Sequence, residues 1–166
     1  IAATSITTAD LDLDGDNDIV IGHKVIWSYT NKSFSILKNV DSGYFQMQDT
    51  SQSFCGTQQN IFACKVDNDS LPDIVTFYSD FTSGAAERFV RIFYNEVGEF
   101  NVYADFSLNN STTFTTINYG DFNGDDFYDV CVISNLSQFL GVVYNDGSGN
   151  FSAPVYYNTA YQPINV

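Results

Sequence analysis

The chain has 166 residues, 44% of them apolar and 16% aromatic, so it can bury a sizeable core. Twenty carboxylates against six lysine and arginine side chains give a formal net charge of −14. This charge argues against sequence-independent binding to nucleic acid or to anionic lipid, and it favours cations as partners. No apolar run is long enough to cross a bilayer, and the chain begins at Ile1, so we expect a processed or excised segment.

Three tandem copies of one pattern organise the chain. An acidic loop begins at Asp10, an equivalent loop begins 55 residues later at Lys65, and a third begins after a further 56 residues at Asp121. A second landmark follows each loop, in which an apolar run ends in Asn and leads to a Gly and a Phe. Because both landmarks keep the same register, they divide the chain into repeats at 1–55, 56–111 and 112–166.

Each repeat contains short runs of β-branched and aromatic residues, which are typical of strands. In the first repeat these runs predict strands over 4–8, 19–21 and 36–39. In the second repeat they predict strands over 60–64, 74–77 and 92–95, and in the third over 113–119, 130–133 and 142–145. No segment has sustained helical periodicity. We therefore predict an all-β fold with about four antiparallel strands per repeat, which is the size of one β-propeller blade.

The first acidic loop has the spacing of a cation site. Asp10, Asp12, Asp14 and Asp18 place carboxylates at positions 1, 3, 5 and 9, and Gly15 stands at position 6. Alternate side chains of a curling loop point inward, and a hard cation such as Ca²⁺ takes about six to eight oxygens. An EF-hand is excluded because position 12 is not Glu and no helices flank the loop. Transition metals fit poorly because the chain has a single histidine.

The other two loops differ from the first at their ligand positions. The third loop keeps the set as Asp121, Asn123, Asp125 and Asp129, for which a solvated acidic turn is the alternative interpretation. The middle loop is degenerate, since Lys65 stands at position 1 and the remaining positions carry Asp67, Asp69 and Asp73. We expect the Lys65 ammonium to replace the metal in an internal ion pair. The chain is therefore predicted to bind two Ca²⁺ ions.

The loops at 10–18 and 121–129, the apolar pair after each, and the Asn and Gly-x-Phe ending resemble the FG-GAP/VCBS repeat family. This family forms the calcium-binding blades of integrin α-type β-propellers and of many bacterial surface proteins. The resemblance covers nearly the whole chain in three copies, and the lack of a literal Phe-Gly pair makes it closer to the VCBS variant. It implies an extracellular protein of cell adhesion. It also implies backbone carbonyl ligands from Asp16 in the first loop and Phe127 in the third.

Cysteines and glycosylation acceptor patterns also bear on location. Cys55 and Cys64 are close enough in sequence for a disulfide, and Cys131 in an apolar run reads as a buried free thiol. The Asn-x-Ser/Thr pattern of a glycoprotein occurs six times, at Asn31, Asn68, Asn109, Asn110, Asn135 and Asn150. Together with loops that need millimolar calcium, these sequons favour an extracellular or cell-surface location.

Three blades do not close a propeller, which typically needs about four to eight. Either the chain is a piece of a longer propeller, or neighbouring copies complete it by sharing strands, as in a fibril. An enzyme is not expected, because twelve of the twenty carboxylates lie in the acidic loops and His23 is the only imidazole. We predict a structural or adhesive module. The alternative is a ligand-binding adhesin or lectin-like propeller fragment that recognises a protein or glycan through exposed aromatic side chains.

Overall fold

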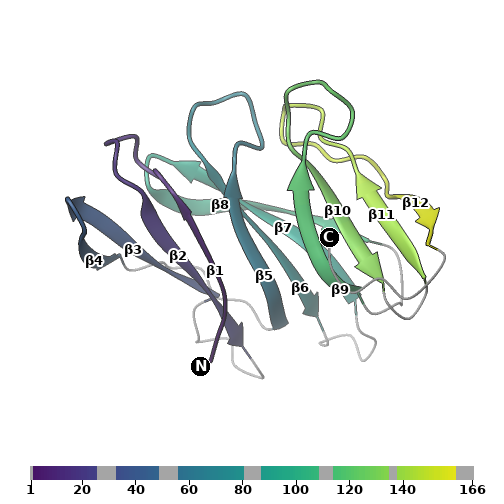
Figure 1. Ribbon diagram of the computed structural model, residues 1–166, viewed down its shortest axis with the longest axis horizontal. Helices are drawn as coiled ribbons and strands as arrows, with labels where there is room; N and C mark the ends of the chain where they lie inside the picture. Colours follow the sequence, from purple (N-terminus) through teal and green to yellow (C-terminus); the bar gives the residue numbers. More distant parts are fainter. Residues whose placement is uncertain are drawn as a thin grey trace. The chain divides into compact units, whose positions relative to one another are not determined.

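The computed structural model describes residues 2–25, 33–48, 56–80, 87–108, 114–134 and 138–159 (Figure 1). Every regular element in these ranges is a β-strand, which confirms the predicted all-β class. Within the same ranges there is no helix of the length and apolarity that a bilayer crossing requires.

The first repeat forms an antiparallel sheet in chain order. Its strands are β1 (Ala2–Ala9), β2 (Asp18–Val25), β3 (Phe34–Asp41) and β4 (Tyr44–Gln48). The acidic loop joins β1 to β2, and the tight turn at residues 42–43 joins β3 to β4. The last two residues of β2 also pair with the start of β5, which links this sheet to the next one.

The second and third repeats form sheets with the same antiparallel order. The second contains β5 (Gly56–Cys64), β6 (Asp73–Asp80), β7 (Glu87–Glu96) and β8 (Glu99–Ser107). The third contains β9 (Phe114–Gly120), β10 (Asp129–Ser134), β11 (Phe139–Val143) and β12 (Val155–Asn158). Each sheet takes its four strands from its own repeat. Completion by a strand of another copy is therefore not needed for these sheets.

The chain divides into two compact units, one made of residues 1–64 and 70–107 and the other of residues 65–69 and 108–166. The core of the first unit is a cluster contributed by two sheets. The ring of Phe34 from the first sheet packs edge-on against Phe93 and Phe100 of the second, with ring centroids 5.0 Å and 6.0 Å apart. The other members of the cluster are Leu11, Val20, Ile36, Ile61, Ile74 and Tyr78. This apolar contact between two sheets buries the start of the first acidic loop.

Cys64 and Cys131 are buried free thiols, as predicted for Cys131. Burial raises the pKa of both thiols and keeps them protonated. Because Cys64 is a free thiol, the predicted disulfide between Cys55 and Cys64 is not formed in this structure. Cys55 itself lies outside the described residues.

Two of the six predicted glycosylation acceptors, Asn68 and Asn150, are exposed loop residues, and the Asn150 amide nitrogen donates to Asp146 at 3.0 Å. The other four, Asn31, Asn109, Asn110 and Asn135, lie outside the described residues.

Candidate metal-binding loops

The first acidic loop coils around the carboxylate of its first residue. Asp10 accepts the backbone N–H groups of Asp14 and Gly15, at 3.1 Å and 2.9 Å. Two left-handed residues permit this coil, Leu13 with φ of +60° and Gly15 with φ of +97°. A glycine tolerates this conformation without a Cβ clash, whereas a leucine does not adopt it readily. The coil turns the alternate carboxylates toward one another.

Three of the four predicted carboxylate ligands meet in this coil. One carboxylate oxygen from each of Asp10, Asp12 and Asp14 lies within 4.8 Å of the other two. The Oδ1 atom of Asp12 is buried and has no hydrogen-bond partner among the described residues, so it has unused lone pairs. Three mutually repelling carboxylates with an unsatisfied oxygen fit a hard cation, because a bound cation would both neutralise and coordinate them.

Asp18 makes backbone hydrogen bonds that its spacing did not predict. This residue is buried, and its two carboxylate oxygens accept the N–H groups of Leu11 and Asn39, at 3.1 Å and 2.8 Å. Burial raises the pKa of Asp18 against the lowering effect of these two hydrogen bonds. Asp18 therefore fastens the start of the loop to β3 and stands outside the cluster of three. Asp16 accepts the N–H of Ser42 at 3.4 Å and donates its own N–H to Asp14.

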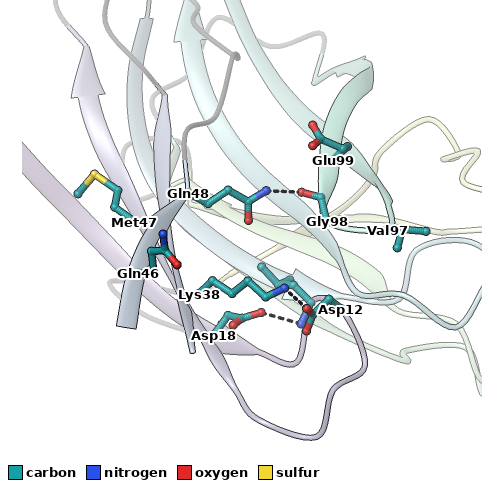
Figure 2. Close-up of a pocket in the computed structure, with 10 residues that line it drawn as sticks. Asp12, Asp18, Lys38, Gln46, Met47, Gln48, Val97, Gly98 and Glu99 are labelled. Carbon is teal, nitrogen blue, oxygen red and sulfur yellow. Dashed lines mark hydrogen bonds and ion pairs between the residues drawn. The ribbon is translucent and has the colours of Figure 1, made fainter. Parts of the chain in front are cut away.

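A pocket of about 440 Å³ opens beside this cluster (Figure 2). Lys38 of β3 reaches across it to form an ion pair with Asp12, which the sequence analysis did not anticipate. On the other side, Gln48 donates a hydrogen bond to the carbonyl oxygen of Gly98 at 2.7 Å, which ties the first sheet to the second. The hydrogen bond that Lys38 donates to the Asp12 carboxylate raises the pKa of Lys38, so this lysine stays charged and competes with any cation for Asp12.

The third loop reproduces the coil of the first. Asp121 accepts the N–H groups of Gly124 and Asp126 at 2.6 Å and 3.1 Å, and both donors have positive φ. These hydrogen bonds, the one from Gly124 first among them, lower the pKa of Asp121. Asn123 donates its amide N–H to Asp125 at 2.8 Å, so the amide nitrogen faces the carboxylate. The third loop therefore has the backbone of the first loop with fewer free oxygens.

The remaining predicted ligands of the third loop are the Asp129 carboxylate and the Phe127 carbonyl oxygen, and backbone groups hold Asp129. Asp129 is fully buried and accepts the N–H groups of Phe122 and Asn145, both at 2.9 Å, which is the role of Asp18 in the first loop. Phe127 donates its N–H to Asp125 at 3.0 Å, and its ring lies over Gly147. A Cβ on Gly147 would meet that ring at 2.3 Å, so only glycine fits there.

The middle loop has a different backbone. No residue from 65 to 73 has positive φ, because Lys65 has no acceptor oxygen that could gather the N–H groups of the loop. Asp67 accepts the N–H of Asp69 at 3.0 Å, and the buried Asp73 accepts the N–H of Asn95 at 2.9 Å. Lys65 is exposed and forms no ion pair with a carboxylate of the described residues, so the predicted internal ion pair is not formed here.

The Asn that ends each apolar run is the residue whose role the sequence analysis missed. Its backbone N–H always binds the buried carboxylate at loop position 9, and its side chain accepts an N–H from the following turn. In two repeats the side-chain amide also donates to the loop of the preceding repeat. Asn95 reaches the carbonyl oxygen of Leu11 at 2.7 Å, and Asn145 reaches that of Val66 at 2.6 Å. The triple recurrence of this Asn was the signal for a role in joining repeats.

Comparisons with known proteins give few matches. No protein-family model matches the chain, and no curated protein matches it. Among solved structures, the chain is similar to a lectin from Agrocybe aegerita, which was studied for its specific recognition of non-reducing terminal N-acetylglucosamine. The two are 17% identical, with a TM-score of 0.38, over 92% of this chain and 51% of the lectin. The chain spans about half the length of that lectin.

Proposed function

We propose that this chain is a calcium-stabilised repeat module of an extracellular or cell-surface protein, with blades of the β-propeller type and a structural or adhesive role. The observation that carries the proposal is the cluster of Asp10, Asp12 and Asp14, with its unpartnered buried oxygen. The third loop, coiled in the same way, is the second proposed site. No catalytic role is proposed for either loop, because their carboxylates serve the cation or the backbone.

Calcium in the first loop would stabilise the fold by removing repulsion. The cluster joins β1 to β2 at a point where three carboxylates approach within 4.8 Å of one another. When bound, the ion would supply positive charge and fixed coordination at this turn. Asp10, Asp12 and Asp14 would hold it, and the proposed carbonyl ligand is that of Asp16. Extracellular calcium is millimolar, and a ligand at about 100 times its dissociation constant stabilises a fold by about 2.7 kcal/mol.

The proposal is tested by thermal unfolding and calorimetric titration with calcium, with magnesium and with a chelator. We expect calcium to raise the melting temperature and magnesium to raise it much less, because magnesium keeps its water ligands. Asp12→Asn should lose most of the gain, since it removes charge from the centre of the cluster. Asp67→Asn is the matched control, because it makes the same change in the degenerate loop. A gain that is absent in the parent chain, or equal in both variants, would contradict the proposal.

A ligand-binding role is the second candidate, favoured by aromatic side chains at an open pocket of the third repeat. Tyr119, Phe122, Tyr144 and Tyr157 line a cavity of about 470 Å³ together with apolar side chains. Aromatic rings of this kind bind the apolar faces of sugars. Titration with N-acetylglucosamine and with other monosaccharides, followed by tyrosine fluorescence, tests this role.

A further inference from the structure

The joint between the first two sheets has two halves, and the equivalent positions of each half can be found in the other repeats. One half is an apolar face of the first sheet, made of Leu11, Val20, Phe34 and Ile36. Leu11 is only 2% exposed, because the second sheet covers it. The other half is an edge of the second sheet, where the Asn95 amide binds the Leu11 carbonyl oxygen and Phe100 packs on Phe34. We call these halves the accepting face and the inserting edge.

The third repeat carries an accepting face that is open. The repeat register makes Phe122, Cys131, Leu140 and Val142 the equivalents of the four residues of that face. All four line the open cavity of about 470 Å³, and Phe122 is 49% exposed, where the equivalent Leu11 is buried. Among the described residues, no hydrogen-bond donor reaches the carbonyl oxygen of Phe122, the equivalent of the one that Asn95 binds.

The first repeat carries an inserting edge that is also open. Asn39 and Phe45 are the equivalents of Asn95 and Phe100. Phe45 is 39% exposed, where Phe100 is 4% exposed, and Val40, Tyr44 and Met47 add exposed apolar surface along the same two strands. The only described acceptor for the Asn39 amide is the Asn17 carbonyl oxygen, at 3.4 Å. One chain therefore carries both halves of a joint that its own first and second repeats show in closed form.

We infer that the accepting face of the third repeat binds the inserting edge of a second copy of this chain, head to tail. Asn39 of one copy donates to the Phe122 carbonyl oxygen of the next, and Phe45 enters the aromatic cavity. The contact is heterologous, so it adds copies in one direction and forms rings or filaments. Unlike strand sharing, it leaves every sheet with its own four strands. The inference deepens the proposed architectural role and rests on it.

The experiment is sedimentation velocity of the whole chain over a range of micromolar concentrations, in millimolar calcium. We expect the parent chain to form species that grow with concentration. Phe45→Asp blocks the inserting edge and Phe122→Ser blocks the accepting face, so each variant alone stays monomeric. Tyr157→Asp blocks the same face outside the acidic loop, in case Phe122→Ser disturbs that loop. Val102→Asp is the control, because this residue is exposed on β8 of the second repeat.

Mixing the two blocked variants gives the decisive result. Phe45→Asp retains an accepting face and Phe122→Ser retains an inserting edge, so an equimolar mixture should form dimers that grow no further. Asn39→Ala should weaken assembly about tenfold, the effect of one lost hydrogen bond of about 1.4 kcal/mol. A parent chain that stays monomeric, a mixture that stays monomeric, or cavity variants that assemble normally would each overturn the inference. So would N-acetylglucosamine binding in the cavity of a monomeric parent chain.

A further measurement distinguishes failure of the head-to-tail contact from failure of the proposed function. The calcium-dependent melting temperature is measured on the monomeric Phe45→Asp and Tyr157→Asp variants, whose substitutions lie outside the acidic loops. If calcium stabilises these variants while the parent chain never assembles, the proposed function stands and the head-to-tail contact is refuted. If calcium has no effect on them, the proposed function fails by itself.

Discussion

Replacing Asn95 with alanine tests the joint between repeats quantitatively. The Asn95 side chain donates to the carbonyl oxygens of Leu11 and Pro72, at 2.7 Å and 3.0 Å, and accepts the N–H of Gly98 at 2.7 Å. The residue is buried, so water cannot replace these three partners. At about 1 kcal/mol for each hydrogen bond, with a further cost for buried groups left unpaired, Asn95→Ala should destabilise the chain by about 3–5 kcal/mol.

Asn39 provides the matched comparison because it is the same residue at the same repeat position. Its side chain accepts the N–H of Gly43 at 2.9 Å but donates only to the Asn17 carbonyl oxygen at 3.4 Å. It makes no bond to a preceding loop among the described residues. Asn39→Ala should therefore cost about 1–2 kcal/mol, and the difference between the two variants measures the contribution of the joint.

Urea unfolding at fixed calcium and at low protein concentration, where copies do not meet, measures both costs. A shift of the midpoint at constant m-value reports a change in stability alone. Asn158→Ala, at an exposed position of β12, is the control for loss of an amide from a strand. Equal costs for Asn39→Ala and Asn95→Ala would refute the reasoning, since the joint would then contribute nothing beyond the local turn.

Three further predictions concern single side chains. Lys38→Met should raise the calcium affinity about two- to fivefold in calorimetric titration, because the ammonium no longer competes for Asp12. Unchanged affinity would mean that the ion pair is absent in solution. Asp126→Gly should stabilise the apo chain by about 0.5–1 kcal/mol in urea unfolding, because Asp126 has φ of +72° and glycine adopts this conformation freely. A loss of stability would show that the side chain has a further contact. Burial lowers the pKa of His23 from 6.5, and its Nε2 lies 2.8 Å from Ser35 Oγ. The unfolded chain therefore binds a proton at His23 more readily than the folded chain does. The contribution of neutral His23 to the free energy of unfolding is complete above pH 6.5 and is lost as the pH falls below this value. In the presence of a chelator, His23→Gln should reduce the loss of stability at acidic pH, measured by calorimetry. An unchanged loss of stability would contradict its assignment to His23.

The repeat pattern was sufficient to predict the all-β class, the approximate positions of the first three strands of each repeat and the four-strand sheets, but it gave no position for the fourth strands β4, β8 and β12. Strand runs such as 74–77 and 130–133 have strong β propensity, and tertiary contacts extend them rather than replace them. The spacing of Asp10, Asp12 and Asp14 also predicted their convergence, because alternate residues of a coiled loop face the same side.

The role of Asp18 was not predictable from spacing alone. Position 9 lies where the loop enters β2, and burial there turns both oxygens toward backbone N–H groups of Leu11 and of Asn39, the latter 21 residues further along the chain. The pair of Lys38 with Asp12 was missed for a similar reason. The two residues meet only through the register between β2 and β3, which brings Lys38 back beside the loop. Sequence spacing describes a loop well, but it does not show which side chains fold back onto that loop.

The amide that joins consecutive repeats has a consequence for how such a chain can change in length. Both partners of the joint lie at fixed positions of the repeat, the donor on Asn95 or Asn145 and the acceptor on Leu11 or Val66. A duplicated repeat therefore arrives with a donor for the unit before it and an acceptor for the unit after it. Duplication of a repeat can lengthen the array, and deletion of one can shorten it, without the evolution of a new interface, because each unit contacts only its neighbours.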